Sequence, residues 1–446
     1  MNKFRTSPFG TWETPITSSV VSSSGVQIKE ISVDDGHVYW LEGRPDEGGR
    51  NVLVTRACNG ALADVTPKGF NVRNSVHEYG GGSYVIHRGV VYFCNWDDQR
   101  IYRQCMGEAP VPITPAPQIP FEDRYADLGV TPNGLFLTCV RERHVEGSET
   151  VNEVVSVSTN GLSDVKVVAT GYDFYSSPRV SLDGRKIAWL SWNHPNMPWD
   201  NTELWSAELD GDCIISSTRH IAGGDEESIL QPEWSPVGTL YFISDRSGWW
   251  NLHRLASDAV EAVAPREAEF GKCYWAFGMS TYTITSDSEA IGQYFVEGRW
   301  QLAQIDLANG AVIDIPTGFV GFGGLHVEDG VITTIASAVD GPEALVRIDA
   351  ASGNTLETLV LSISTPLDTA YISIPEHIDF PTEGGLTAHG LYYAPVNSDC
   401  VGPADELPPL IVVSHGGPTG STDAEFDLKL QYWTSRGFAV VDVNYG

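Results

Sequence analysis

Short runs of alternating apolar and polar residues follow one another along most of the chain, each after a turn that contains Asp or Gly. The same phrase recurs as VDDGHVYWLEG, HRGVVYFCNW, TPNGLFLTCV, SLDGRKIAWLSW, SPVGTLYFISD and VEDGVITTIAS. Alternation with a period of two residues is typical of a β-strand that buries one face. The phrases therefore predict a body of β-strands joined by tight turns.

The turns recur at a nearly constant distance along the chain. Their glycines are Gly36, Gly89, Gly134, Gly184, Gly238 and Gly330. The step is roughly 45–55 residues, except that the last is about twice as long and contains a seventh copy, TSDSEAIGQYF, with Glu289 near the place of the glycine. Further strand phrases follow each turn, such as NVLVTR and TELWSAEL, and an inner strand precedes it, so each repeat provides four strands.

Four-stranded repeats of roughly 40–50 residues are the signature of β-propeller blades. A single four-stranded sheet cannot bury both of its faces, whereas sheets arranged in a ring pack face to face. We therefore expect residues 25–362 to form an all-β, seven-bladed propeller after an N-terminal segment, residues 1–24. A β-sandwich or several small β domains are the alternatives, and the regular spacing argues against both.

The pattern changes after Leu361. AYISIPEHIDFPTEGGLTAHGLYYAP alternates like an antiparallel hairpin, and PPLIVVSHGGPTG opens with a continuous apolar strand over 410–413, typical of a buried parallel strand. AEFDLKLQYWTSRGF predicts a helix with Phe426, Leu430 and Trp433 on one face and Gly437 as its stop. AVVDV is another buried strand, so residues 363–446 are predicted to begin a doubly wound α/β sheet.

The chain is strongly acidic, with a formal net charge of -31. This charge argues against nucleic acid and anionic membrane surfaces as partners, and no apolar run approaches the ~20 residues of a membrane span. The seven cysteines are scattered, without a CxxC pair or a Cys/His cluster. Together with the absence of an apolar N-terminal leader, this predicts reduced thiols, no metal site and a cytoplasmic protein. We expect no cofactor.

The sequence His415-Gly416-Gly417-Pro418 follows the first of the buried strands. Acyl transfer places negative charge on a tetrahedral oxygen, and each main-chain N–H aimed at that oxygen contributes roughly 3 kcal/mol. In α/β-hydrolases a glycine-rich loop after an early strand provides one such donor. A tight turn without catalytic meaning is the alternative. The position of the motif, between a buried strand and a strand–helix–strand unit, favours the oxyanion loop.

The order of these motifs resembles that of the prolyl oligopeptidase family of serine peptidases, and most of all its acylaminoacyl-peptidase and dipeptidyl-aminopeptidase branch. Four further stretches also resemble that branch: HEYGGGSYVI at 77–86, residues 177–205, SPVGTLYFISDRSGWWNLHRL at 235–255, and RGFAVVDVNYG. The likeness therefore covers essentially the whole chain. The resemblance implies a serine-type peptidase that cleaves short peptides or aminoacyl amides, with the propeller gating access to an α/β-hydrolase domain. Residues 1–24 are expected to pack on the hydrolase part, through which self-association is an open alternative.

The resemblance also implies roles for particular residues. Gly417, with Gly416 beside it, would donate main-chain N–H groups to the oxyanion, while the imidazole of His415 would be structural. Glu78, next to Tyr79 at the start of an inner strand, would bind the free α-amino group of a substrate. A glutamate satisfied by an arginine or by N–H groups of a neighbouring blade is an equally weighted alternative.

The loop SWNHPNMPWD at 191–200 is too apolar for open solvent. Trp192, His194 and Trp199 are expected either to form a substrate wall that faces the hydrolase part or to pack between blades. The sequence favours the second alternative somewhat, because packing is the commoner role of such residues.

The nucleophile of such a peptidase is a serine in a G-x-S-x-G elbow. No serine among the 446 residues has glycine at both the second preceding and the second following position. The resemblance implies that the catalytic serine, aspartate and histidine follow later than Gly446, so we expect an incomplete chain, without peptidase activity of its own. A propeller that has lost catalysis and serves as a binding or scaffold protein is the alternative.

Overall fold

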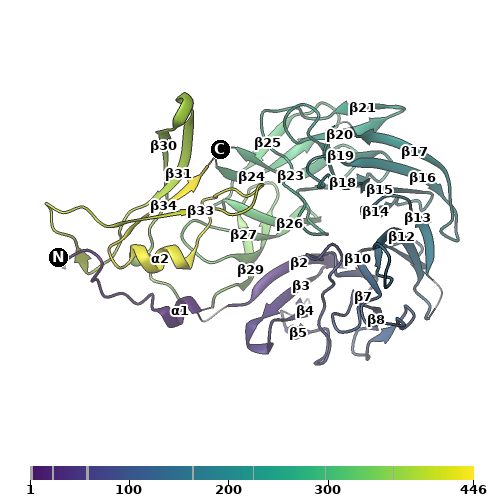
Figure 1. The fold of residues 1–446 in the computed structure, drawn as a ribbon, viewed down its shortest axis with the longest axis horizontal. Coiled ribbons are helices and arrows are strands. Elements are labelled where there is room, and N and C mark those ends of the chain that lie inside the picture. Colours follow the sequence, from purple (N-terminus) through teal and green to yellow (C-terminus); the bar gives the residue numbers. More distant parts are fainter. Residues whose placement is uncertain are drawn as a thin grey trace.

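The computed structural model describes residues 4–22, 25–56, 60–162, 165–224, 226–296, 298–364 and 366–445. Most of these residues form seven four-stranded antiparallel sheets, which are arranged around a common centre (Figure 1). Within each sheet, four strands that are consecutive in the sequence pair in chain order.

The strands of the first four sheets are β2 (Gln27–Asp34), β3 (His37–Arg44), β4 (Arg50–Arg56) and β5 (Leu62–Asp64); β6 (Tyr84–His87), β7 (Val90–Cys94), β8 (Ile101–Cys105) and β9 (Val111–Pro112); β10 (Asp123–Val130), β11 (Phe136–Arg143), β12 (Val151–Ser158) and β13 (Lys166–Ala169); β14 (Phe174–Val180), β15 (Lys186–Trp192), β16 (Glu203–Leu209) and β17 (Ile215–Gly223). Those of the last three are β18 (Ile229–Trp234), β19 (Leu240–Ser244), β20 (Asn251–Ala256) and β21 (Ala259–Ala262); β22 (Tyr282–Ile284), β23 (Glu289–Val296), β24 (Arg299–Asp306) and β25 (Val312–Ile315); β26 (Gly321–Glu328), β27 (Val331–Ser337), β28 (Ala344–Asp349) and β29 (Thr355–Leu361).

The first strands of successive sheets contact one another in a closed cycle, from β2 through β6, β10, β14, β18, β22 and β26 back to β2. This is the arrangement of a seven-bladed propeller, and the seven predicted repeats are confirmed as seven sheets. The predicted turn glycines join the first and second strands of six sheets, and their φ angles lie between 72° and 83°. Glycine takes this left-handed conformation without steric cost.

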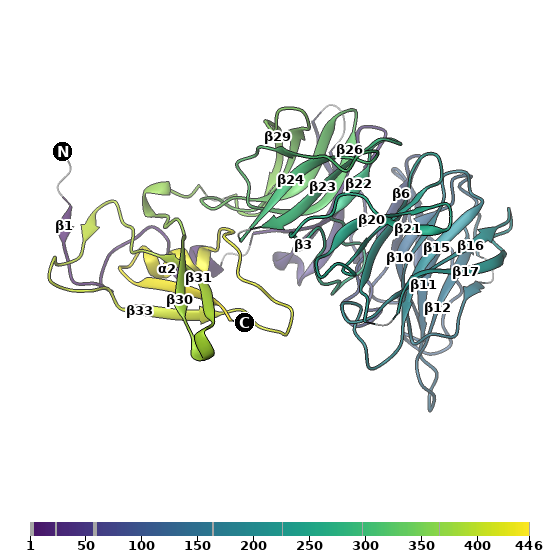
Figure 2. The ribbon, with the colours of Figure 1, turned by 90° about the horizontal axis from the view of Figure 1, so that it is seen from above.

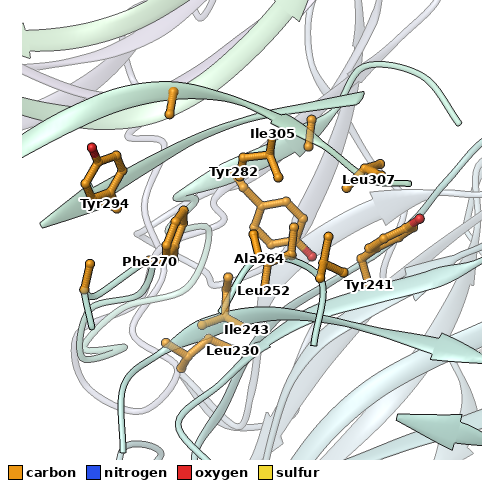
Figure 3. Close-up of a cluster of buried hydrophobic side chains, with 14 residues drawn as sticks. Leu230, Tyr241, Ile243, Leu252, Ala264, Phe270, Tyr282, Tyr294, Ile305 and Leu307 are labelled. Carbon is orange, nitrogen blue, oxygen red and sulfur yellow. The ribbon is translucent and has the colours of Figure 1, made fainter. Parts of the chain in front are cut away.

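Neighbouring sheets pack face to face through buried apolar side chains. Figure 3 shows the contact between the fifth and sixth sheets, where Leu230, Ile243 and Leu252 meet Tyr282 and Ile305. None of these five side chains is more than 2% exposed. Burial of one such side chain stabilises the fold by ~1.5–3 kcal/mol, so contacts of this kind between sheets are a main source of the stability of the ring.

Three side chains on inner strands also link neighbouring sheets, because each accepts a hydrogen bond from a main-chain N–H of the next sheet. Glu30 accepts from Ser83 at 2.7 Å, Asp127 from Ser177 at 2.6 Å, and Gln231 from Thr281 at 2.7 Å. Each acceptor has a positive φ and lies at a break in the strand register. A bulge of this kind redirects a side chain, and here it brings the acceptor to the next sheet.

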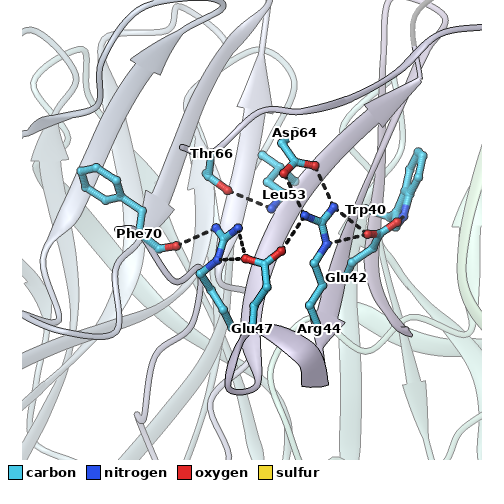
Figure 4. A network of polar contacts seen from close by, with 9 residues as sticks. Trp40, Glu42, Arg44, Glu47, Leu53, Asp64, Thr66 and Phe70 are labelled. Atoms are coloured by element: carbon cyan, nitrogen blue, oxygen red, sulfur yellow. Dashed lines mark hydrogen bonds and ion pairs between the residues drawn. The ribbon is translucent and has the colours of Figure 1, made fainter. Parts of the chain in front are cut away.

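A network of ion pairs ties together the outer part of the first sheet (Figure 4). Arg44 at the end of β3 lies 2.8 Å from Glu42, 3.1 Å from Glu47 in the short 3-10 helix η1 (Pro45–Glu47), and 2.7 Å from Asp64 in β5. The hydrogen bond from Arg44 holds the pKa of Asp64 below its ordinary value. One guanidinium thus holds the outermost strand against the rest of its sheet.

An eighth sheet, of mixed type, lies beside the ring (Figure 2). Its order is β30-β31-β34-β33: β30 (Glu376–Pro381) and β31 (Thr387–Tyr393) form the predicted antiparallel hairpin, and β33 (Leu410–Ser414) runs parallel to β34 (Ala439–Asn444). The helix α2 (Leu428–Thr434) lies between β33 and β34 in the sequence, and two short helices, η2 (Thr369–Tyr371) and η3 (Glu383–Gly385), flank β30. Among the described residues, no helix combines the length and apolar character that a bilayer crossing requires.

The strand over 410–413 has the apolar sequence of a buried strand, but the described residues leave it at an edge, as expected for a hydrolase sheet of which only the first strands are present. β33 is parallel to β34, as predicted, but it lies at the edge of its sheet, and Leu410 and Val412 are 56% and 63% exposed. A continuous apolar run indicates that both faces of a strand are suited to burial. It does not indicate whether neighbouring elements among the described residues cover them.

The helix α2 is shorter than predicted, and of the predicted apolar face only Leu430 is a buried residue of the helix. Asp427 caps its first turn, so Phe426 precedes the helix, and Trp433 is 40% exposed. Gln431 is fully buried instead, and its side chain forms two hydrogen bonds with the main chain of Ser373, at 2.7 and 3.1 Å. A count of apolar positions cannot detect an inward-facing side chain that is polar.

Residues of the N-terminal segment run along this C-terminal part of the chain (Figure 1). β1 (Arg5–Thr6) pairs in parallel with β32 (Cys400–Val401), and the helix α1 (Ser18–Ser22) contacts α2. The guanidinium of Arg436 donates to the carbonyl oxygen of Ile16 at 2.8 Å. The domain boundaries after residues 24 and 362 stay predictions.

Several carboxylates meet where the segment 421–427 contacts the seventh sheet. The carboxylate of Glu425 lies against Gly321 of β26, in the space that a side chain at that position would take. Glu343 faces Glu425, which in turn faces Asp423 and the ammonium group of Lys272. Burial raises the pKa of Glu343 to about 7 and shifts the pKa values of Glu425 and Asp423 in the same direction.

We expect the contribution of Glu343 to the free energy of unfolding to fall as the pH rises from about 4.5 to about 7. A carboxyl whose pKa is raised by folding binds its proton more tightly in the folded chain than in the unfolded chain. The folded state is therefore favoured below this window and loses that advantage across it. Glu343→Gln keeps a neutral side chain at every pH, so its stability relative to the unsubstituted chain should rise between about pH 5 and pH 8, which urea unfolding measures. The same difference between the two chains at both pH values would contradict the role of Glu343.

Candidate functional site

A cavity of about 810 Å³ opens on the face of the ring near the start of the inner strands β6, β14 and β22. The predicted substrate residues Glu78, Tyr79, Trp192, His194 and Trp199 all line it. They come from the turn before β6 and from the end of β15 and the loop that follows. The structure thus brings together two segments that lie far apart in the sequence.

The turn HEYGGG before β6 has an unusual backbone. His77 and Glu78 have φ angles of 51° and 67°, and the three glycines at 80–82 follow with φ angles of 68°, 106° and 53°. Residues other than glycine rarely adopt this region, at a cost of ~1–3 kcal/mol each. Phe277 explains the path of the turn, because it runs directly alongside and donates its main-chain N–H to the carbonyl oxygen of Gly80 at 2.9 Å.

Glu78 projects into the cavity with a side chain that is 84% exposed. One carboxylate oxygen lies 3.6 Å from a guanidinium nitrogen of Arg124. The same nitrogen lies closer, at 3.1 Å, to the buried carboxylate of Glu142, which also accepts the main-chain N–H of His77 at 2.8 Å. Glu78 thus has an arginine partner, as one of the two alternatives proposed. The ion pair is long, however, and leaves most of the Glu78 carboxylate open to the cavity.

Aromatic rings form another wall of the cavity. The rings of Trp199 and Trp275 lie 4.4 Å apart between centroids, and Tyr79 meets Trp275 edge to face at 5.5 Å. Trp192 stacks on Phe174 at 5.5 Å and is only 7% exposed. Trp192 also meets the ring of His77, from the turn before β6 of another sheet, at 5.6 Å. It therefore packs between sheets as well as lining the cavity, so the two roles considered for the loop 191–200 are not exclusive.

The two histidines of the cavity differ in their surroundings. His194 is exposed at the rim, where its main-chain N–H donates to the carboxylate of Asp173 at 2.9 Å. His77 is enclosed by the rings of Trp192 and Phe277, and burial lowers its pKa to about 4. The imidazole of His77 is therefore neutral near pH 7. Within the part of the chain that the structure describes, no group of three or more His, Cys, Asp or Glu residues is placed to hold a metal ion.

Sequence reasoning missed several residues of this cavity, above all Trp275 and Phe277. Both lie in the connection between β21 and β22, outside the strand phrases of the repeat. The run YWAF at 274–277 was a usable signal, because an aromatic run in a long connection needs a packing partner. Arg124 and Glu142 were missed because they are single polar residues within ordinary strands.

The loop 415–420 approaches the cavity from the C-terminal part of the chain. Its residue Thr419 accepts the indole N–H of Trp275 at 2.8 Å. Gly416 and Gly417 are exposed, and no acceptor among the described residues takes the main-chain N–H of either. The two glycines do not line the cavity itself. They lie next to the point where the loop is attached to the aromatic wall.

The fold and the cavity define a class of protein: a seven-bladed propeller with a ligand-sized cavity close to a second, mixed-sheet part. A puromycin-hydrolyzing peptidase of Mycobacterium tuberculosis is similar, with a TM-score of 0.93, 33% identity, and coverage of 99% of this chain and 69% of that one. A puromycin hydrolase is similar with a TM-score of 0.90, 33% identity and the same coverage. The chain belongs to the prolyl oligopeptidase family of serine peptidases, so the resemblance inferred from the sequence is confirmed.

A more distant likeness concerns the fold alone. A prolyl endopeptidase structure has a TM-score of 0.70 at 12% identity, with coverage of 94% of this chain and 61% of that one. No protein-family model and no curated protein matches the chain.

Proposed function

We propose that this chain provides the propeller of a serine-type peptidase that hydrolyses short peptides or aminoacyl amides with a free amino terminus. The observation that carries the proposal is the exposed carboxylate of Glu78 beside the aromatic wall in one cavity of about 810 Å³. A carboxylate binds an ammonium group by charge-assisted hydrogen bonds, and flat rings pack against apolar or aromatic side chains. Puromycin, named in both relatives, is an aminoacyl amide that carries both groups.

In this proposal the mixed sheet with α2 is the beginning of an α/β-hydrolase domain. The main-chain N–H groups of Gly416 and Gly417 would donate to the oxyanion that forms when a serine attacks the scissile carbonyl. Their lack of an acceptor among the described residues supports this role. One such donor stabilises the transition state by roughly 3 kcal/mol. The serine, its base and the orienting acid would come from sequence outside residues 1–446.

Glu78→Gln is expected to weaken puromycin binding by about tenfold and to leave N-acetylpuromycin binding within about twofold, because only puromycin presents an ammonium group to the lost charge. Isothermal titration calorimetry on the 446-residue chain measures both affinities. Glu108→Gln is the matched control, since Glu108 is an exposed glutamate in the turn after β8, away from the cavity.

The paired ligands separate charge recognition from a general loss of the cavity. Equal weakening of puromycin and N-acetylpuromycin would contradict the role of Glu78. Failure of the unsubstituted chain to bind either compound would refute the proposed ligand class.

A further inference from the structure

Trp275 connects the cavity wall to the loop 415–420. Its ring packs with Trp199 at 4.4 Å and with Tyr79 at 5.5 Å, and its indole N–H donates to the hydroxyl of Thr419 at 2.8 Å. One segment of the ring therefore contacts both the space where a ligand would lie and the loop that holds Gly417.

The remainder of the loop has little else to hold it. Gly417 and its neighbours are exposed, and Gly417 has a φ of 72°, where glycine moves without steric cost. On the side of the mixed sheet, the ring of His415 stacks on Tyr445 at 4.2 Å, and the Tyr445 hydroxyl donates to the carbonyl oxygen of Gly417 at 3.4 Å. The direction of the Gly417 N–H therefore depends on two attachments, one at Tyr445 and one at Thr419.

We propose that Trp275 is a positioning residue that couples occupation of the cavity to the order of the loop 415–420. A ligand packed against the rings of Trp199 and Trp275 restricts the motion of the indole. An indole already held in place loses less entropy when it binds the Thr419 hydroxyl, so ligand and loop order favour each other. The coupling is reciprocal, because the same free energy links both events. The choice of an aminoacyl amide as the ligand rests on the proposed function, whereas the hydrogen bond between Trp275 and Thr419 is independent of it.

NMR order parameters of the main-chain amides at 415–420 test the contact first without any ligand. In the 446-residue chain, Trp275→Phe keeps an aromatic ring and removes the N–H, and Thr419→Val keeps the shape and removes the hydroxyl. Each variant should lower the order parameters of the loop amides from about 0.8 to about 0.6, and the double variant should be no lower than either single one, because both remove one hydrogen bond. Thr419→Ser retains the hydroxyl and should restore the higher values. Amides of β34 serve as the internal control.

The same measurement with puromycin tests the coupling. Saturating puromycin should raise the order parameters of the loop amides in the unsubstituted chain and in Thr419→Ser, and should have no effect on the loop in Trp275→Phe or Thr419→Val, although calorimetry still detects binding to both. A ligand-induced rise that persists in Trp275→Phe would overturn the proposal, as would unchanged ligand-free order parameters in both single variants. Absence of puromycin binding, with the ligand-free effects intact, would refute the proposed function and leave the contact between Trp275 and the loop established.

Discussion

Replacing Asp127 by alanine is expected to lower the free energy of unfolding by ~3–5 kcal/mol. Asp127 is 2% exposed, and it accepts the main-chain N–H of Ser177 at 2.6 Å and a guanidinium N–H of Arg179 at 2.8 Å. Its removal leaves the half-buried guanidinium of Arg179 without its counter-charge and a buried main-chain donor of the next sheet without an acceptor. Urea unfolding followed by tryptophan fluorescence measures the loss.

Two further variants isolate the reason for this effect. Asp258 pairs with Arg219 at 2.5 Å, but its side chain is 87% exposed, so Asp258→Ala should cost less than about 1 kcal/mol. Asp127→Asn keeps one acceptor oxygen and removes the charge, and an intermediate loss is expected. Similar losses in Asp127→Ala and Asp258→Ala would show that burial and the link between sheets do not matter at Asp127.

The sequence predicted the ring because its repeat is local. In six of the seven sheets the turn between the first and second strands has a left-handed residue, and glycine provides it at Gly36 and at five later positions. The links between sheets were not predictable in the same way. Glu30, Asp127 and Gln231 occupy equivalent bulges but differ in residue type. A bulge is set by the pairing of two strands, and the pattern of one strand does not reveal it.

The cavity was only partly predictable for a similar reason. HEYGGG and the loop 191–200 are compositionally unusual, so Glu78 and Trp199 could be identified as candidates. Arg124 and Glu142 are ordinary strand residues that lie opposite each other in β10 and β11, and only the ring brings them beside the turn that holds Glu78. The exposure of Val412 also depends on tertiary contacts, because a run of apolar residues has the same sequence in a central strand and in an edge strand.

Replacing Gly81 by alanine is expected to cost ~3 kcal/mol or more and to abolish puromycin binding. Gly81 has a φ of 106°, and a Cβ there would lie 2.8 Å from the main-chain nitrogen of Phe277 and would overlap its carbonyl oxygen. Both are backbone atoms, so no change of rotamer relieves the clash. The segment 274–277 would have to move away from the turn, and Trp275 would move with it, so the aromatic wall and the position of Glu78 would be lost together.

Gly89→Ala is the matched control for this prediction. Gly89 has a φ of 76°, so alanine is strained there as well, but nothing lies within 4 Å of the added Cβ. The cost at Gly89 should therefore be the ~1–2 kcal/mol of a left-handed alanine alone, with puromycin affinity unchanged. Urea unfolding and calorimetry on the two variants separate backbone strain, which they share, from the close approach of Phe277, which is specific to Gly81. Equal costs at the two positions, with ligand affinity intact in both, would show that the path of Phe277 does not hold the cavity in shape.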